Sequence, residues 1–363
     1  MRGFLIICIL ATGLHAKAQA DPGELPVAAM ESIYQQVKTP YKYGLVVIPE
    51  SNDYKVDCPT VFRNKGHWFM SYIRYDGRGY ETWLAKSEDL LHWTTLGRVL
   101  AFSDSSDWDN NQKAGYNALL DYRWGGSYKP FRYKGRYWMS YLGGHAFGYE
   151  SGMLSVGISF TSHGIDSPRL WTRLPNPVLK PADPDARWWE NNTIYKSSVL
   201  WDRTRSTGHS FVMYYNAKGD SSQPGGANVE RIGMAVSDDM EHWTRYRRDP
   251  VLDHHEGITG DAVIQKIAKT WVMFYFGAFW NNKAGAFNNF ACSYDLVHWT
   301  DWKGKPLISP SEPYDETYAH KSFVVKYGGV VYHFYCAVNR AGQRGIALAT
   351  SRDQGKSLLT FSK

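Results

Sequence analysis

Ionisable residues stand at the beginning of five short segments that the sequence predicts to be buried strands. These residues are Asp57, Lys129, Lys196, Asp261 and the adjacent pair His320 and Lys321. Buried strands usually begin with apolar residues, because a charged group that leaves water needs a partner. Ionisable groups that gather in one cleft favour a functional site. The carboxylates and the histidine could act as general acid or base, and the lysines could bind an anion or lower the pKa of a neighbouring carboxylate.

The segments that lead into these strands, or connect their neighbours, carry further acids beside tryptophans. The candidates for a catalytic or substrate-binding role are Glu81, Trp108, Trp189, Glu190, Trp280 and Glu316. The connecting segments also contain Tyr149, Glu150, Glu230 and Arg344. Hydrolysis of a glycosidic bond requires one carboxyl that protonates the leaving oxygen and a second that serves as base or nucleophile. Because flat aromatic rings can stack on sugar faces, this composition favours a carbohydrate site.

The three lysines leave two interpretations open. If Lys129, Lys196 and Lys321 face the substrate, they favour an anionic sugar, such as a uronate or a sulfated sugar, or inorganic phosphate. If each lysine neutralises a carboxylate instead, it stabilises the charged form of that acid, and the substrate can be neutral.

Other chemistries find little support in the sequence. A nucleophile elbow, a phosphate-binding glycine-rich loop and a His-Glu-x-x-His motif do not occur, so we expect no cofactor. His254 and His255 are adjacent and would point apart on an extended chain, so we expect no metal site. The net charge of +6 comes without basic runs, which gives little support for nucleic-acid binding. Cys58, Cys292 and Cys336 lie in apolar surroundings and are expected to be buried free thiols.

A repeated motif organises most of the chain. Ser-x-Asp-x-x-His-Trp occurs at 87–93, 237–243 and 293–299, each time between two apolar segments, and predicts a turn between strands. Aromatic-rich strands are expected at 67–72, 136–141, 210–215, 270–276 and 330–335. A further short strand is expected before each, at 58–62, 130–133, 197–201, 262–266 and 322–325. Five such units with a period of roughly 50 to 75 residues are typical of an all-β fold, the five-bladed β-propeller.

Three regions are expected along the chain. Residues 1–20 combine a positive start, an apolar stretch and small residues at the end, as in a secretory signal peptide. Residues 21–42 form an N-terminal arm, in which apolar residues at helical spacing predict a helix over 27–37, and residues 43–363 form the propeller. The apolar stretch is too short to span a bilayer, so we expect export to the periplasm or the exterior without membrane insertion. The sequence decides neither the oligomeric state nor whether the arm packs on its own propeller or on a neighbour.

The opening strand Asp57-Cys58-Pro59-Thr60-Val61-Phe62 and the period of the repeat resemble the five-bladed propeller glycoside hydrolases, a group that includes families 43, 117 and 130. The resemblance to family 43 implies that Asp57 is the general base and that the reaction inverts the anomeric centre. It also implies that Glu190 and Asp261 supply the other two carboxylates, one of them as the acid. The resemblance to family 117, which uses a histidine near the last blade, implies His320 beside Glu316 as an alternative acid.

Together these features predict a secreted, exo-acting glycosidase that removes a terminal sugar from plant or algal polysaccharide fragments. Its expected partner is an oligosaccharide or polysaccharide, either anionic or neutral. A glycoside phosphorylase that uses inorganic phosphate and a non-catalytic carbohydrate-binding propeller are the alternatives that the sequence leaves open.

Overall fold

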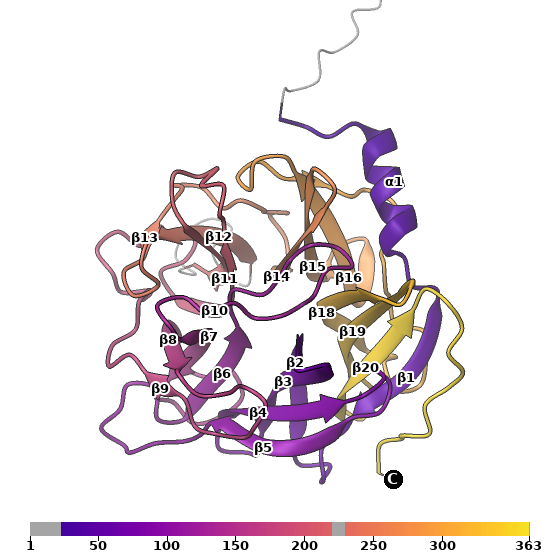
Figure 1. Cartoon of the computed structure of the whole chain (residues 1–363), viewed down its shortest axis with the longest axis horizontal. Helices are drawn as coiled ribbons and strands as arrows, with labels where there is room; N and C mark the ends of the chain where they lie inside the picture. Colours follow the sequence, from indigo (N-terminus) through magenta and orange to yellow (C-terminus); the bar gives the residue numbers. More distant parts are fainter. Residues whose placement is uncertain (1–22, 220–228, 363) are drawn as a thin grey trace, which may run out of the picture.

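The computed structural model describes residues 23–219 and 229–362. This part of the chain is mostly β-structure, and it contains one helix, α1 (Val27–Val37), which precedes the first strand (Figure 1). The predicted all-β class and the predicted helix agree with this composition. The predicted signal peptide, residues 1–20, lies outside the described residues.

Among the described residues, the strands pair in five consecutive antiparallel groups of four, which we call groups 1 to 5. Group 1 consists of β2 (Lys55–Asn64), β3 (His67–Tyr75), β4 (Tyr80–Ser87) and β5 (Thr94–Leu100). Group 2 consists of β6 (Gln112–Asn117), β7 (Tyr137–Gly144), β8 (Ser155–Thr161) and β9 (Thr172–Arg173). Group 3 consists of β10 (Thr193–Trp201), β11 (Phe211–Lys218), β12 (Glu230–Ser237) and β13 (Thr244–Arg245). Group 4 consists of β14 (Ile258–Ile267), β15 (Thr270–Trp280), β16 (Lys283–Ser293) and β17 (Thr300–Asp301). Group 5 consists of β18 (Tyr318–Tyr327), β19 (Val330–Val338), β20 (Arg344–Thr350) and the N-terminal strand β1 (Tyr41–Val47).

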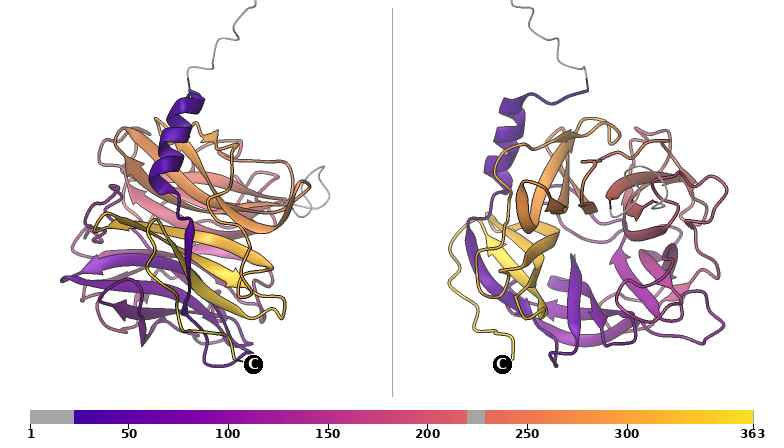
Figure 2. Two further views of the ribbon diagram at one scale, coloured as in Figure 1. Left: turned by 90° about the vertical axis from the view of Figure 1, so that its right-hand side faces the viewer. Right: turned by 180° about the vertical axis from the view of Figure 1, so that it is seen from behind.

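The groups follow one another in a circle around a common centre, with the first strand of each group innermost (Figure 1). Single parallel pairs join group 1 to group 2, group 3 to group 4 and group 4 to group 5, as with Tyr80 and Gln112 or Glu230 and Ile258. Strand β1 completes the last group by pairing with β20, so strands from the two ends of the chain lie in one sheet. The side view in Figure 2 shows the sheets at an angle to one another and α1 on the outside of the circle.

The Ser-x-Asp-x-x-His-Trp motif forms the predicted turn between the third and fourth strands of groups 1, 3 and 4. In group 1, Ser87 Oγ accepts hydrogen bonds from the backbone N–H groups of Asp89 and Leu90, at 3.2 and 2.9 Å. Asp89 Oδ1 accepts from the His92 N–H at 2.9 Å, and the Trp93 indole donates to the Leu90 carbonyl at 3.1 Å. The same bonds recur in the other two copies. The motif therefore satisfies the polar groups of its own turn, which explains why it repeats without any part in the chemistry.

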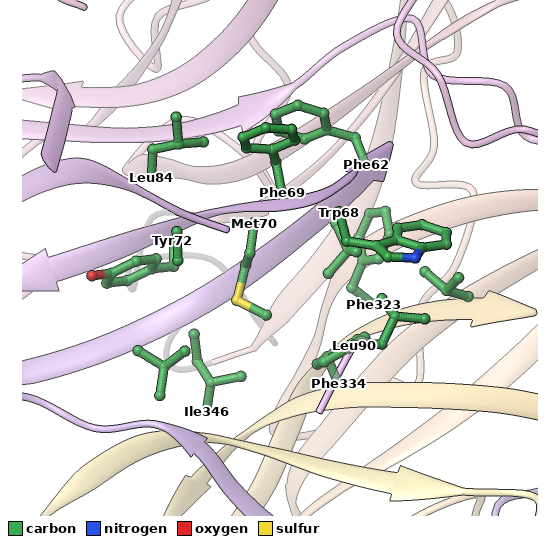
Figure 3. Packing of buried hydrophobic residues seen from close by; sticks show 14 of the residues in the cluster. Phe62, Trp68, Phe69, Met70, Tyr72, Leu84, Leu90, Phe323, Phe334 and Ile346 are labelled. Atoms are coloured by element: carbon green, nitrogen blue, oxygen red, sulfur yellow. The ribbon is translucent and has the colours of Figure 1, made fainter. Parts of the chain in front are cut away.

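Apolar side chains fill the spaces between the groups. Figure 3 shows the core between the first and the last group of the circle. Phe62 and Phe69 of group 1 belong to one cluster with Phe323 and Phe334 of group 5. Burial of these rings removes a large apolar area from water and stabilises the closed arrangement.

Helix α1 packs on the circle of strands through its apolar stripe. Met30, Ile33 and Val37 are buried in a core that they share with groups 4 and 5, and Tyr34 stacks on Trp302 with 5.1 Å between the ring centres. In this structure the arm therefore covers the outside of its own circle of strands.

The prediction of an inner strand at 130–133 is wrong. The inner strand of group 2 is β6, and the following segment 118–136 makes only isolated bridges, such as Leu120 with Pro130. Phe131 and Tyr133 pack against a neighbouring hydrophobic core, although they belong to no strand. This packing accounts for the apolar residues in the segment. Lys129 therefore does not begin an inner strand, and its side chain is exposed.

Candidate functional site

A cavity of about 140 Å³ lies between the inner strands of all five groups, to which group 2 contributes Tyr116 of β6. Its wall contains four carboxylates, those of Asp57, Glu150, Glu230 and Asp261. It also contains three cationic side chains and a histidine, namely Lys196, Lys321, Arg344 and His320. The structure thus brings five of the predicted site residues into one cavity: Asp57, Lys196, Asp261, His320 and Lys321.

A β-bulge in each of four inner strands explains why so many polar groups reach this cavity. In β2, β10, β14 and β18 the register shifts so that two residues oppose a single residue of the next strand. In β18, for example, the shift lies between His320 and Phe323. Successive side chains of a regular strand point to opposite faces, whereas the bulge lets His320 and Lys321 both line the cavity.

Three of the bulges hold a non-glycine residue in the left-handed region of backbone conformation. The φ angles of Cys58, Asp261 and Lys321 are 49°, 58° and 59°. Such conformations cost on the order of 1–3 kcal/mol each and persist only where the surrounding structure enforces them, which is common at functional sites. All three residues line the cavity, so the strain is located where the polar groups converge.

Asp57 is enclosed by hydrogen-bond donors. Its Oδ2 lies 3.0 Å from Lys321 Nζ and 2.7 Å from Arg344 Nη1, and it accepts a hydrogen bond of 2.8 Å from the Tyr149 hydroxyl. Its Oδ1 accepts from the Cys58 N–H at 2.8 Å. Burial alone would raise the pKa of Asp57, but the charges of Lys321 and Arg344 hold it well below its ordinary value. Asp57 is therefore ionised at neutral pH.

Glu150 and Glu230 have opposite environments. Glu150 Oε1 lies 3.2 Å from the ammonium of Lys321, and the Glu150 side chain is 31% exposed. Glu230 accepts a hydrogen bond of 3.0 Å from the Asn216 amide and has no ion-pair partner among the described residues. Burial, with a smaller contribution from the negative charge of Glu150, raises the pKa of Glu230 to about 8. The environment of Glu230 therefore favours its protonated form, whereas Glu150, which lines the same cavity, is paired with a cation.

Asp261 and Lys196 form a looser pair. Lys196 Nζ lies 3.7 Å from Asp261 Oδ2 and 5.2 Å from the centre of the Tyr116 ring. Burial raises the pKa of Asp261, and the positive charge of Lys196 opposes this rise without cancelling it.

His320 is held as a neutral ring. Its Nδ1 lies 3.2 Å from the Cys336 carbonyl oxygen, so this nitrogen carries the proton and donates it. Burial, followed by the charges of Arg344 and Lys321, places the pKa of His320 well below its ordinary value. The ring is therefore unsuited to protonate a leaving group, which argues against the alternative acid suggested by sequence.

The structure places Glu190 outside the cavity. Its carboxylate is buried against Arg245 at 2.9 Å, and it accepts a hydrogen bond from the Tyr215 hydroxyl. A similar contact recurs, since a tyrosine in the second strand of each of groups 2 to 5 donates to a carboxylate that precedes the first strand of the group or, in group 4, lies in its fourth strand. The pairs are Tyr141 with Asp109, Tyr215 with Glu190, Tyr275 with Asp301 and Tyr335 with Asp315. Glu190 is thus one copy of a repeated structural contact, which accounts for its burial.

The predicted tryptophans also have structural partners. Trp108 stacks on Tyr141 and Trp189 on Tyr215, with ring centres 5.9 and 6.3 Å apart. Trp280 donates to the Ile258 carbonyl at 2.9 Å, and it does not line the cavity.

Two of the predicted acids form ion pairs outside the cavity. Glu81 is buried against Arg98 at 3.1 Å, and Glu316 pairs with Arg340 at 3.1 Å. Neither residue lines the cavity.

Four cavity residues were noted in the sequence only as members of connecting segments: Tyr149, Glu150, Glu230 and Arg344. Glu230 and Arg344 are the first residues of the third strands of groups 3 and 5, and Tyr149 and Glu150 precede the third strand of group 2. A third strand that begins beside the inner strand brings its first residue to the same end of the group. Their position in the repeat is therefore the sequence signal that could have identified these four residues as site candidates.

Within residues 23–219 and 229–362, no cluster of three or more His, Cys, Asp or Glu side chains has the arrangement of a metal site. No helix in this part of the chain is long and apolar enough to cross a membrane. Cys58, Cys292 and Cys336 are free and buried, as predicted.

Comparison with solved structures identifies the class of protein. The chain is 53% identical to BT0996, a protein solved as a complex with RGII, with a TM-score of 0.90 over 93% of this chain and 98% of that one. It is 51% identical to a protein described as "Glycoside hydrolase", with a TM-score of 0.90 over 94% of this chain and 99% of that one. A thermostable family-43 glycoside hydrolase shares the fold, with a TM-score of 0.57 at 14% identity over 84% of this chain and 91% of that one. No protein-family model matches the chain, and no curated protein matches it significantly.

These matches, together with the carboxylate-lined cavity, define the protein as a glycoside hydrolase. It belongs to the same family as BT0996 and the second hydrolase, whose chains it covers almost completely. The resemblance to propeller glycoside hydrolases that the sequence suggested is confirmed. The phosphorylase and the non-catalytic propeller receive no support from this membership.

Proposed function

We propose that this protein is an exported, exo-acting glycosidase built as a five-bladed β-propeller. Five consecutive antiparallel groups arranged in a circle, and the fold shared with a family-43 hydrolase, support the assignment of groups 1 to 5 as blades (Figure 1). A cavity of about 140 Å³ has the size of a single sugar ring. This size supports removal of one terminal sugar rather than cleavage within a long bound polysaccharide.

The observation that carries the proposed mechanism is the raised pKa of Glu230 beside the ion-paired Glu150. A general acid must hold its proton at the working pH, and a pKa of about 8 meets this requirement. A carboxyl group whose environment raises its pKa is suited to the role of acid, and a carboxyl group paired with a cation is suited to the partner role. We therefore assign the general acid to Glu230 and the second catalytic carboxylate to Glu150.

In the proposed reaction, the proton of Glu230 moves to the glycosidic oxygen while the bond between this oxygen and the anomeric carbon breaks. A water molecule forms the new bond to the anomeric carbon from the opposite face and gives its proton to Glu150. Inversion is the expectation from the family resemblance, and it requires this use of water. Solvent then takes the proton from Glu150 and returns one to Glu230.

Asp57 receives a different role from the one suggested by sequence. Both of its oxygens already accept hydrogen bonds or ion pairs, and its pKa is well below the ordinary value, so it is a weak base. We assign it the role of positioning Lys321 and Arg344. Lys321 in turn orients Glu150.

The charge balance of the cavity supports a neutral terminal sugar. With Glu230 protonated, the carboxylates of Asp57, Glu150 and Asp261 match three cations in number: Lys196, Lys321 and Arg344. No excess positive charge remains to hold an anionic group, so we favour the second interpretation of the lysines. Because BT0996 was solved in complex with RGII, this plant pectic polysaccharide is the substrate that we test first. Export to the periplasm or the exterior, where such fragments occur, is part of the same proposal.

The test is incubation of the purified protein with RGII oligosaccharides and a panel of aryl glycosides, with and without phosphate, followed by chromatography of released sugars. We expect release of one neutral monosaccharide without phosphate. Glu230→Gln should lower kcat by roughly 100- to 10,000-fold, as expected for loss of a general acid. Glu316→Gln, which alters an ion-paired surface carboxylate outside the cavity, is the matched control and should keep full activity. Failure to release any sugar, or full activity of Glu230→Gln, would contradict the proposal.

A further inference from the structure

Lys196 lines the cavity and also a second, smaller one, and Tyr116 lines both as well. The Lys196 side chain is 4% exposed, and within the described part of the protein its ammonium has no hydrogen-bond acceptor. Its separation of 3.7 Å from Asp261 Oδ2 exceeds the 2.7–3.2 Å of an ordinary N–H···O hydrogen bond.

A buried ammonium group in this condition retains unused donors. Burial of a charged donor costs free energy unless hydrogen bonds replace those lost from water. The face of Tyr116 offers only a partial replacement. Asp261 is similar, since its Oδ2 accepts from the Cys58 thiol at 3.7 Å, and a thiol is a weak donor. Both side chains can therefore still bind a ligand in the cavity.

We propose that Lys196 and Asp261 together recognise one hydroxyl group of the terminal sugar, a role that rests on the exo-glycosidase activity proposed above. A hydroxyl is both acceptor and donor, so its oxygen accepts from Lys196 while its proton is donated to Asp261. An oxygen about 2.9 Å from the ammonium and about 2.7 Å from the carboxylate closes the gap between them. A carboxylate or sulfate oxygen at this point has no proton to donate and is repelled by Asp261.

The pair therefore selects a sugar that carries a hydroxyl at one position of its ring. A deoxy sugar would leave the ammonium and the carboxylate without a partner in the complex. Hydrogen bonds to charged groups contribute enough for us to expect binding that is about 10- to 100-fold weaker. Sites built to bind a hydroxyl discriminate in this way because their own polar groups remain unpaired when it is missing.

The experiment measures competitive inhibition by the free terminal sugar and by each of its monodeoxy derivatives, with the oligosaccharide from the activity screen as substrate. Wild-type protein should bind one of these derivatives about 10- to 100-fold more weakly than the parent sugar. The quantity compared is the ratio of the inhibition constant of each derivative to that of the parent sugar. Lys196→Met keeps an apolar side chain of similar length, and it should reduce the ratio for this one derivative to near 1 while the ratios for the other derivatives persist. Lys129→Met, which alters an exposed lysine outside the cavity, is the control and should leave every ratio unchanged.

A purely structural role of Lys196 would weaken all sugars alike and leave the ratio as it is, which would overturn the proposal. Thermal unfolding shows whether Lys196→Met is folded, and Lys196→Gln, whose amide can donate to the hydroxyl, should restore part of the ratio. If wild-type protein binds all derivatives equally, the proposal is wrong whatever the variants do. If wild-type protein releases no sugar at all, the glycosidase activity itself is refuted, whereas an active enzyme with unchanged ratios refutes only this role.

Discussion

The ammonium of Lys321 lies 3.0 Å from Asp57 Oδ2, although 264 positions separate the two residues in the sequence. The contact joins the inner strand of the last group to the inner strand of the first. Lys321 also lies 3.2 Å from Glu150. The same cation therefore contacts both the first group, through Asp57, and a proposed catalytic carboxylate.

Replacement of Lys321 by methionine should lower both stability and activity. Removal of one partner of a buried ion pair typically costs 3–5 kcal/mol, and because Arg344 still compensates Asp57 we expect a loss of about 3 kcal/mol in the free energy of unfolding. Urea unfolding measures this change. Lys303→Met is the control, because Lys303 is 80% exposed and its ion pair with Asp301 should contribute less than about 1 kcal/mol. Equal unfolding midpoints for wild type and Lys321→Met would contradict the prediction.

Glu230→Gln should be more stable than wild type at pH 7. The pKa of Glu230 is about 8 in the folded protein against an ordinary 4.5, so between these values the unfolded protein is ionised while the folded protein keeps its proton. The stability that protonated Glu230 contributes is complete below pH 4.5 and is lost as the pH rises towards 8. Over 2.5 pH units this loss is about 3 kcal/mol at pH 7, and glutamine avoids it. Unfolding experiments at pH 4 and pH 7 should show the difference at pH 7 only, and a variant less stable than wild type at pH 7 would refute this account.

The rate of hydrolysis should fall on the alkaline side with a midpoint near pH 8. Glu230 can act as an acid only while protonated, so kcat/KM should decrease tenfold for each pH unit well above the pKa of the free enzyme. A pH series of initial rates at low substrate concentration checks this. Activity that stays constant up to pH 10 would exclude Glu230 as the acid.

The first product should have the inverted anomeric configuration. Proton NMR spectra recorded within the first minutes of hydrolysis distinguish the anomers before mutarotation mixes them. Inversion is expected when Glu150 takes a proton from water on the face opposite Glu230. Retention would instead assign Glu150 as the nucleophile and would show that the mechanism implied by the resemblance does not hold here.

Phe279 should contribute to binding of the sugar next to the cleaved bond. This residue lines the cavity, is 60% exposed and has a φ of 57°, a conformation that a bulky residue adopts only when the surrounding structure imposes it. Loss of an aromatic contact of about 1 kcal/mol should raise KM for an oligosaccharide about fivefold in Phe279→Ala, with little change in kcat. Phe279→Tyr should behave as wild type. Phe147 is 69% exposed but does not line the cavity, so an equal effect of Phe147→Ala would show that exposure alone explains the result.

The sequence allowed the centre of the site to be predicted because ionisable residues there interrupt apolar segments. Asp57, Asp261 and the pair His320 and Lys321 have this property, and all four line the cavity. The order of the strand groups could be predicted because the turn motif repeats. A turn that satisfies its own polar groups needs the same residues in each group in which it occurs. The predicted strand that carried Lys129 was wrong because apolar residues can pack against a core without joining a sheet.

The functional ranking of the acids could not be predicted in the same way. Glu190 beside Trp189 has the composition of a sugar site, and only the three-dimensional contact with Arg245 and Tyr215 shows that its carboxylate is occupied. Glu230 is the opposite case, a site residue that the sequence did not rank as a candidate. Its raised pKa depends on burial and on the absence of a cationic partner among the described residues. Both properties arise from residues distant in sequence, so no local pattern reports them.

The bulges in β2, β10, β14 and β18 have a consequence for how this enzyme can diversify. Each bulge adds one residue to a strand that continues its pairing on both sides, so the backbone hydrogen bonds of the sheet do not depend on the side chain at that point. Substitutions there can alter which sugar is accepted without a change in strand pairing, even where the side chain contributes to stability, as Lys321 does. Descendants of one ancestral scaffold could in this way acquire new specificities through a handful of interchangeable positions, without any rearrangement of the backbone.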